Sequence, residues 1–225
     1  MEERTLAAIV IGQSPRPDVA ALLQAAVGPG TRVRLVGCMD GLSRDEMAAV
    51  PPVDDGDTLF TKLPDGSGAV LSKRLVTTRA QALVDGFAAE AGVGATLMCC
   101  TGAFPGLKPA GVVIFPSALL SGLADGLLPA GRLGLLVPLP AQTGALAAKW
   151  ERPGLEVVAE ALLPLADDAE AMAAGDRMAA HRPDLVVMDC ISYTPAHRAA
   201  VRRRLSCPVL LGITTTAAIL REMFL

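Results

Sequence analysis

Two cysteines occupy matching positions in two distant parts of the sequence. Cys100 ends the apolar segment 95–100, Cys190 ends the apolar segment 185–190, and a polar loop follows each of them. Each pattern predicts a buried parallel strand that ends at a thiol, and the loops beyond the carboxyl ends of such strands form the ligand site of open α/β sheets. Two thiols presented in this way suggest an acid–base pair that acts on a carbon acid.

The other three cysteines fit a structural role better. Free cysteine is commonly a small buried residue, and this interpretation suits Cys38 and Cys207. Cys99 should point to the opposite side of its strand from Cys100. Five cysteines at irregular spacing predict no disulfide framework, and two histidines with no Cys-x-x-Cys pair predict no metal site.

The loop that follows the first predicted strand, residues 11–18, is a candidate ligand site. Gly12 allows the backbone to approach a ligand closely, and Arg16 can pair with a carboxylate through two hydrogen bonds. The loop has neither a dinucleotide-binding nor a Walker glycine pattern. A second interpretation, compatible with the first, is that the two prolines shape a helix start with Asp18 as its cap. The candidate binding residues here are Gln13, Ser14 and Arg16.

Polar residues also follow the other predicted strands, where they could hold substrate oxygens or cap turns. Asp189 is an acid at the end of an apolar run, so it needs a partner and could be structural or support the site from behind. His197 fits a structural role better than that of a catalytic base. The candidate binding residues in these loops are Thr101, Gly102, Gln142, Thr143, Ser192 and Tyr193.

Two short basic segments stand out, residues 72–74 and 202–204. The first follows a predicted hairpin, and it is either a solvated edge or a positive rim of the ligand site. The second lies at the end of a predicted helix, where positive charge offsets the helix dipole.

Strand-like segments alternate with Ala-rich helical segments throughout, which predicts parallel sheets covered on both faces. A first α/β half over residues 1–110 and a second over 111–205 are expected, with segment 206–225 packed back on the first. The predicted strands are residues 6–11, 31–36, 58–63, 69–72, 95–100, 112–115, 132–137, 185–190 and 208–212, with 155–162 extended or mixed. The predicted helices are residues 18–27, 43–50, 77–91, 117–126, 141–150, 167–181, 195–205 and 214–224. Ser43 and Glu46 predict a capping box at the second of them, and the Asp167–Asp168 pair predicts a cap at the sixth.

Composition narrows the class of protein. Aromatic residues make up only 3% of the 225 residues and the net charge is −3, which argues against a nucleic-acid partner. No uncharged apolar run reaches about 18 residues, so no membrane span is expected. The first residues are charged and lack the pattern of a signal peptide, which leads us to expect a cytoplasmic protein.

Three segments resemble the AroM family: residues 11–16, residues 100–105 and residues 188–190, with the first being the most specific. The resemblance spans essentially the whole chain and implies a branch of the Asp/Glu racemase superfamily. It further implies two flavodoxin-like halves related by a pseudo-two-fold, with the active site between them. Racemases of that superfamily use no cofactor and one cysteine from each half, here Cys100 and Cys190, and a homodimer is compatible with the resemblance.

The motifs differ from those of the amino-acid racemases. Where these carry Cys-Asn-Thr, this chain has Cys100-Thr101-Gly102, or Cys99-Cys100-Thr101 in the other register. The Gly-Cys-Thr-His motif is replaced by residues 189–192, and the racemases' Asp-Ser-Gly loop by residues 13–16. The substrate is therefore not inherited from the racemases.

These observations lead to three hypotheses. The first is a cofactor-independent isomerase of a small carboxylate or cyclic imide, with two-cysteine proton transfer in the cleft between the halves. The second is a decarboxylase or cis–trans isomerase with a single essential cysteine. The third is a regulatory protein that binds a small anion without turnover.

Overall fold

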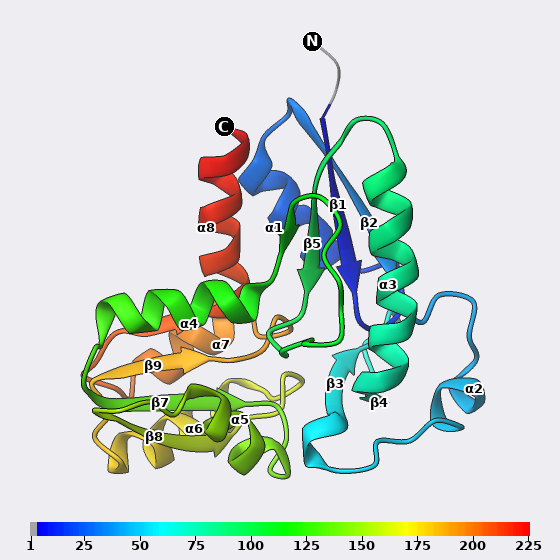
Figure 1. Cartoon of the computed structure of the whole chain (residues 1–225). Helices are drawn as coiled ribbons and strands as arrows, with labels where there is room; N and C mark the ends of the chain where they lie inside the picture. Colours follow the sequence, from blue (N-terminus) through cyan, green and yellow to red (C-terminus); the bar gives the residue numbers. More distant parts are fainter. Residues whose placement is uncertain (1–3) are drawn as a thin grey trace. The chain divides into compact units, whose positions relative to one another are not determined.

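Seven-residue apolar strands followed by amphipathic helices build most of the chain, for which a computed structural model describes residues 4–225 (Figure 1). The chain divides into two units. Unit 1 runs to Pro116 and includes Thr216–Leu225, whereas unit 2 comprises Ser117–Thr215. The division thus falls a few residues beyond the boundary near 110 expected from the sequence, and segment 206–215 belongs to unit 2.

A four-stranded parallel sheet forms the centre of unit 1 within the described residues. Alternate residues of the first strand, such as Ala7 and Ile9, pack into one cluster of buried side chains, while Leu6 and Ala8 point to the opposite face. Both faces are therefore covered, as a parallel sheet requires. The strands in spatial order are β2 (Thr31–Gly37), β1 (Arg4–Val10), β5 (Val93–Cys99) and β6 (Val113–Ile114).

Two helices of unit 1 lie against this sheet. Helix α1 (Pro17–Val27) starts with proline at its first position, where the missing N–H has no cost, and contacts β2. Helix α3 (Lys73–Ala89) contacts β5 and β1 through Val76, Ala80 and Val84. It starts four residues earlier than predicted, because the hydroxyl of Ser72 accepts a hydrogen bond from Leu75 N–H and caps the helix.

An inserted segment between β2 and α3 carries the predicted hairpin. Its strands β3 (Thr58–Lys62) and β4 (Gly68–Ser72) pair antiparallel. A short helix α2 (Arg44–Ala48) precedes them and has the predicted Ser43–Glu46 capping box, and a 3₁₀ turn η1 (Asp55–Asp57) leads into β3.

Unit 2 repeats the architecture of unit 1. Its four parallel strands have the spatial order β8, β7, β9, β10, which matches β2, β1, β5, β6 position by position. The elements are β7 (Gly131–Val137), β8 (Leu155–Ala161), β9 (Leu185–Met188), β10 (Val209–Leu211), α4 (Pro116–Leu127), α5 (Gln142–Trp150), α6 (Asp168–Ala180) and α7 (Pro195–Arg202). The predicted α/β class is confirmed, and residues 155–161 form a full strand.

The last strand of each sheet leads into a helix assigned to the other unit. Strand β6 leads into α4, almost all of which belongs to unit 2, and β10 leads into α8 (Gly212–Phe224), whose residues from Thr216 onward belong to unit 1. In unit 1 the end of α8 packs beside Gly28 and Gly94, where an added Cβ would meet Leu225 and Phe224 respectively. Among residues 4–225, no helix combines the length and apolar character needed to cross a bilayer.

Candidate functional site

The strands of unit 1 end at one level, and this brings three segments to the same edge of the sheet. Val10 is the register partner of both Gly37 and Cys99, so the chain leaves β1, β2 and β5 side by side. The loop at residues 11–16, Cys38 and Cys100 therefore gather at the carboxyl edge. The connections reverse direction between β1 and β5, and such a switch point is where α/β sheets bind ligands.

Cys100 differs from its neighbouring cysteines in exposure and in contacts. It lies just beyond β5, is half-buried, and its Sγ accepts a hydrogen bond from Gly102 N–H at 3.3 Å. A hydrogen bond to sulfur favours the thiolate. Cys99, the last residue of β5, is buried, and this burial raises its pKa. Burial, with the charge of Cys100 as a smaller contribution, also raises the pKa of Cys38 to about 12. Both remain neutral thiols at physiological pH.

The side chains of Gln13 and Ser14 hold the protein's own loops. Gln13 Nε2 donates to the carbonyl oxygens of Met39 at 3.2 Å and Leu42 at 2.6 Å. Ser14 donates to Asp40 through its backbone N–H and its hydroxyl, both at 2.7 Å. The two candidate binding residues thus fix the segment that follows β2 against the segment that follows β1.

Arg16 is buried, and its guanidinium group is paired with a carboxylate of the same chain. Its Nε and Nη2 donate to the two oxygens of Asp18 at 2.9 and 2.8 Å, and Nη1 donates to the Lys62 carbonyl at 3.1 Å. Burial opposes ionisation of Asp18, but the Arg16 contacts outweigh it and lower the pKa of Asp18. The bidentate pair is thus made within the protein, with Asp18 and not a ligand as the carboxylate. Asp18 forms no helix cap, since Arg16 itself precedes the first residue of α1.

Unit 2 gathers the corresponding segments at the carboxyl edge of its own sheet. Met188 is the register partner of Leu136 and Leu211, so the chain leaves β9 beside the ends of β7 and β10. Cys190 lies two residues beyond β9 and is 7% exposed. Its strand takes the place in unit 2 that β5 takes in unit 1, so Cys100 and Cys190 follow topologically equivalent strands.

An ion pair lies at the residue directly before Cys190. Asp189 is buried, and its Oδ2 accepts hydrogen bonds from Lys149 Nζ at 2.8 Å and Trp150 Nε1 at 3.0 Å. Its Oδ1 is buried with no hydrogen-bond donor among the described residues. The sequence indicated that Asp189 needs a partner but did not identify one. Lys149 is in the last turn of α5, forty positions away.

Tyr193 and His197 support the interior of unit 2. The Tyr193 hydroxyl donates to the Leu162 carbonyl, and burial, with the charges of Cys190 and Asp189, raises the pKa of Tyr193 well above its usual value. The His197 ring contacts Thr194 in a capping box at the start of α7 and the Ala166 carbonyl at 3.0 Å. The ring of Tyr193 packs edge-on against that of His197. The structural interpretation of His197 agrees with these contacts.

The remaining candidates lie at the same two edges. In unit 1, Thr101 is buried directly after Cys100. In unit 2, Gln142 is buried at the first position of α5, and Thr143 is exposed with its hydroxyl on the Pro140 carbonyl. Ser192 is half-buried in the turn between Cys190 and Tyr193. Within residues 4–225, no group of three or more His, Cys, Asp or Glu side chains could hold a metal ion.

Solved structures with the same fold come from three kinds of enzyme. Glutamate racemase from Francisella tularensis, in complex with D-glutamate, is 12% identical with a TM-score of 0.62, over 99% of this chain and 81% of that one. A double mutant of arylmalonate decarboxylase, in a liganded form, is 16% identical with a TM-score of 0.61, over 97% of this chain and 92% of that one. Maleate cis–trans isomerase from Nocardia farcinica is 18% identical with a TM-score of 0.62, over 99% and 93%. The chain thus has the fold of the Asp/Glu racemase superfamily.

One family model accounts for nearly the whole chain. The model described as AroM protein matches residues 6–224, so the chain belongs to the AroM family. No curated protein sequence matches the chain. The resemblance recognised in the sequence is confirmed.

Proposed function

We propose that this AroM-family protein is a cofactor-independent isomerase of a small carboxylate or cyclic imide, with Cys100 and Cys190 as its proton-transfer groups. The observation that carries the proposal is their equivalence: each follows the third strand in sheets of identical order, beside the switch point. The fold neighbours named above act on, or are named for, glutamate, an arylmalonate and maleate, all of which are carboxylates.

The proposed step conserves protons. The thiolate of one cysteine takes the proton from the carbon next to the substrate carbonyl, and the C–H electron pair passes into an enediolate. The thiol of the other cysteine then delivers its proton to the opposite face of that carbon. The first cysteine ends as the thiol and the second as the thiolate, so the roles are exchanged for the reverse reaction.

The surroundings of each thiol fit this task differently. The thiolate of Cys100 would be stabilised by the Gly102 N–H that already points at its sulfur. Cys190 directly follows Asp189 in the sequence, and the buried carboxylate of Asp189 binds the ammonium group of Lys149. We assign the ion pair to fixing the segment that carries Cys190, and Lys149 is the residue that sequence reasoning missed.

The test is incorporation of solvent deuterium at the carbon next to the carbonyl, followed by NMR in D₂O. The panel comprises amino acids, hydantoins and 2-substituted acids. We expect exchange with at least one compound, and a loss of about 10²-fold or more in both Cys100→Ser and Cys190→Ser, because general acid–base catalysis typically contributes that much. Cys207→Ser, a half-buried thiol between α7 and β10, is the matched control and should exchange normally. Unchanged exchange in both serine variants would sink the two-thiol mechanism.

One observation favours a second candidate, a regulatory protein that binds a small anion without turnover. The guanidinium of Arg16 and the polar groups of Gln13, Ser14 and Tyr193 already bind other parts of the chain, so four candidate binding residues have internal partners. This candidate predicts thermal stabilisation by an anion, no deuterium exchange, and alkylation of Cys100 and Cys190 by iodoacetamide no faster than of a free thiol. A decarboxylase or cis–trans isomerase would instead lose turnover in only one of the serine variants.

A further inference from the structure

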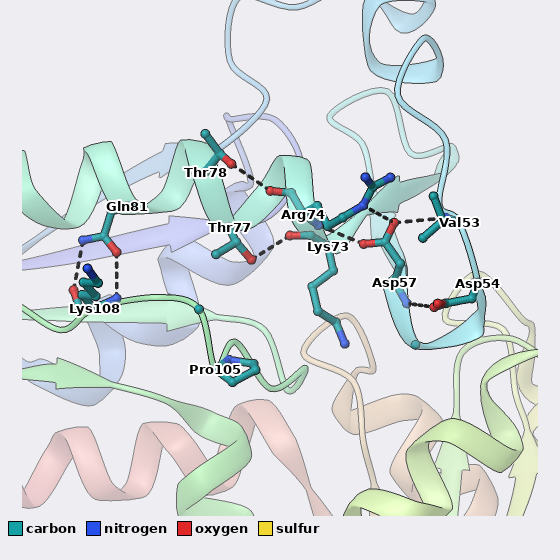
Figure 2. A pocket seen from close by; sticks show the side chains of 12 residues that line it. Val53, Asp54, Asp57, Lys73, Arg74, Thr77, Thr78, Gln81, Pro105 and Lys108 are labelled. Carbon is teal, nitrogen blue, oxygen red and sulfur yellow. Dashed lines mark hydrogen bonds and ion pairs between the residues drawn. The ribbon is translucent and has the colours of Figure 1, made fainter.

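Unit 1 contains a cavity of about 720 Å³ that the thiols do not line. Three segments form its walls: the turn at residues 53–57, the first turns of α3, and the loop at residues 105–108 (Figure 2). Its size is in the range of sites that hold small organic molecules. The lysine and arginine of the basic segment at residues 72–74, which the thiol chemistry leaves unused, line this cavity.

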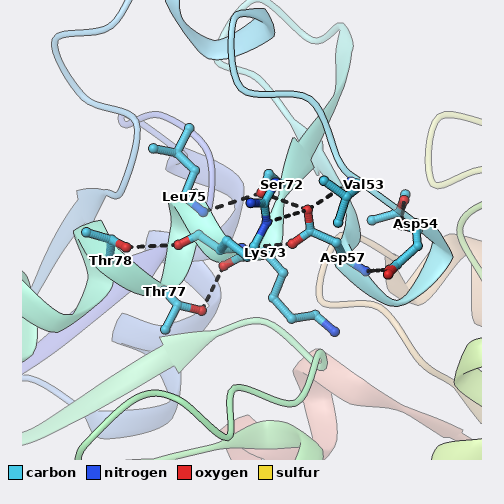
Figure 3. A network of polar contacts seen from close by, with 10 residues as sticks. Val53, Asp54, Asp57, Ser72, Lys73, Leu75, Thr77 and Thr78 are labelled. Carbon is cyan, nitrogen blue, oxygen red and sulfur yellow. Dashed lines mark hydrogen bonds and ion pairs between the residues drawn. The ribbon is translucent and has the colours of Figure 1, made fainter.

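The wall formed by residues 53–57 is fixed by one buried carboxylate. Asp57 accepts hydrogen bonds from Val53 N–H at 3.1 Å, the Ser72 hydroxyl at 2.9 Å, and Arg74 N–H and Nε at 3.0 and 3.3 Å (Figure 3). Its negative charge is therefore balanced by the residues that hold it. These contacts also occupy the N–H groups of Arg74 and Leu75, so the start of α3 is capped from within.

The opposite wall is fixed by the Gln81 side chain. Its amide donates to the Lys108 carbonyl at 3.0 Å and accepts from Lys108 N–H at 2.7 Å, which ties the 105–108 loop to α3. The hydroxyls of Thr77 and Thr78 donate to the carbonyls of Lys73 and Arg74 one turn earlier. These hydroxyls are thus bound to the helix backbone, and the methyl group of Thr77 faces Gly106 in the 105–108 loop. Both walls are held by hydrogen bonds, so the cavity is formed before any ligand binds.

Two cations remain available in this cavity. Among residues 4–225, the ammonium groups of Lys73 and Lys108 have no ion pair or hydrogen bond, whereas Arg74 is paired with Asp57. Figure 2 shows the Lys73 side chain extending from the start of α3 into the space between Pro105 and the Asp54–Asp57 turn. Asp54 also lines the cavity, and its carboxylate accepts from Asp57 N–H at 2.8 Å.

We propose that this cavity binds a small organic anion, with Lys73 holding its charged group and the apolar walls holding its body. Val53, Pro105 and the Thr77 methyl group supply the apolar surface. A carboxylate and a phosphate monoester share the required chemistry, because an ammonium is a compact charge that binds either.

Binding is measured on the full-length protein by calorimetry, with phenylacetate and phenyl phosphate as probes. Benzyl alcohol tests the need for charge, and inorganic phosphate tests the need for an apolar body. We expect saturable binding of at least one aromatic anion at millimolar concentration or below. Benzyl alcohol should bind at least tenfold more weakly, because a hydrogen bond to a charged group is worth about that factor or more. Inorganic phosphate should also bind at least tenfold more weakly, because it has no apolar surface to bury. A preference between the two anions identifies carboxylate or phosphate as the natural group.

Two kinds of variant test the location. Lys73→Gln removes one cation and should weaken binding about tenfold or more, while Lys62→Gln, a lysine of the same unit that does not line the cavity, should have no effect. Gly106→Leu tests the space: Gly106 lines the cavity and an added Cβ there has only Thr77 Cγ2 within 4 Å, at 3.6 Å, so we expect the leucine side chain to occupy the cavity. It should abolish binding, whereas Gly30→Leu, with open space around its Cβ, should not.

Three results would overturn the proposal: no saturable binding of either aromatic anion, binding that Lys73→Gln and Gly106→Leu both leave unchanged, or binding that is lost in Cys100→Ser. The last result would place the anion at the thiols. Because no cysteine lines the cavity, the fate of this proposal does not depend on the deuterium-exchange experiment.

Discussion

Two buried carboxylates illustrate how single residues organise the edges of the sheets. Asp57 holds the start of α3 through three hydrogen bonds, from Ser72 and Arg74, and Asp189 holds the end of α5 through Lys149 and Trp150. A buried charge is tolerated only where hydrogen bonds and an opposite charge compensate its lost hydration. Each of these aspartates therefore fixes a segment that carries a residue with a proposed role, Lys73 in one case and Cys190 in the other.

The Asp57 contacts predict a pH-dependent contribution to stability. Burial opposes ionisation, but the hydrogen bonds from Arg74, Ser72 and Val53 outweigh it, and the pKa of Asp57 lies below its usual 3.8. A carboxyl group with a lowered pKa in the folded state contributes stability that is present above its unfolded pKa and is lost as the pH falls through its folded pKa. Asp57→Asn should therefore lower the free energy of unfolding by about 1–3 kcal/mol at neutral pH.

The difference between wild type and Asp57→Asn should narrow as the pH falls below about 4, because the wild-type carboxyl then becomes protonated. Urea denaturation followed by circular dichroism at a series of pH values measures this. A difference that stays constant down to about pH 2 would contradict the assignment of the lowered pKa.

At the scale of helices and strands, close approach depends on small residues at a few positions. Gly175 in α6 faces α7, and an added Cβ would lie 3.1 Å from the Val201 carbonyl oxygen and 3.0 Å from Arg204 Cβ. Gly122 in α4 has no atom within 4 Å of such a Cβ. A larger residue is therefore expected to disturb the packing at Gly175 but not at Gly122.

Gly175→Ala should destabilise the protein by about 1–3 kcal/mol, since the backbone of α7 must move away. Gly122→Ala should stabilise it by up to about 1 kcal/mol, because alanine has the higher helix propensity and nothing crowds it. Thermal unfolding of both variants by calorimetry provides the comparison. Equal changes in the two variants would show that α6 and α7 are not in close contact.

At the scale of the whole molecule, unit 1 includes a segment from the far end of the sequence, whereas unit 2 is one continuous stretch of chain. Leu220 of α8 is fully buried and belongs to unit 1, although most of unit 1 precedes it by more than one hundred positions. Leu133 of β7 is fully buried in the core of unit 2. The two leucines are therefore matched probes of the two cores.

Leu220→Ala should cost about 2–5 kcal/mol, and the loss should appear first in unit 1. Hydrogen exchange followed by mass spectrometry should show reduced protection in β1 and β5 and a smaller change in β7 and β9. Leu133→Ala should give the reverse pattern. Uniform loss of protection in both variants would mean that the two units unfold as one.

Local pattern was sufficient for most elements. The capping box at Ser43 and Glu46, the hairpin that ends at Ser72, and the Asp167 cap of α6 involve residues close together in sequence, so the sequence predicted them. The start of α3 was predicted too late. Its N-cap residue, Ser72, donates a hydrogen bond to Asp57, fifteen positions earlier, and local pattern does not show that contact. Strand order was not predicted, since parallel pairing joins residues that no local pattern relates.

For the site, the sequence by itself determined that Cys100 and Cys190 each follow an apolar strand, because hydrophobic runs and strand ends are local features. Only the tertiary structure decided that their strands are equivalent in two sheets of the same order. It also decided that Arg16 is paired with Asp18, that Lys149 is the partner of Asp189, and that Lys73 and Lys108 line one cavity. The physical reason is that a charged side chain pairs with the groups that the fold places within about 3 Å of it, and these can be distant in the sequence.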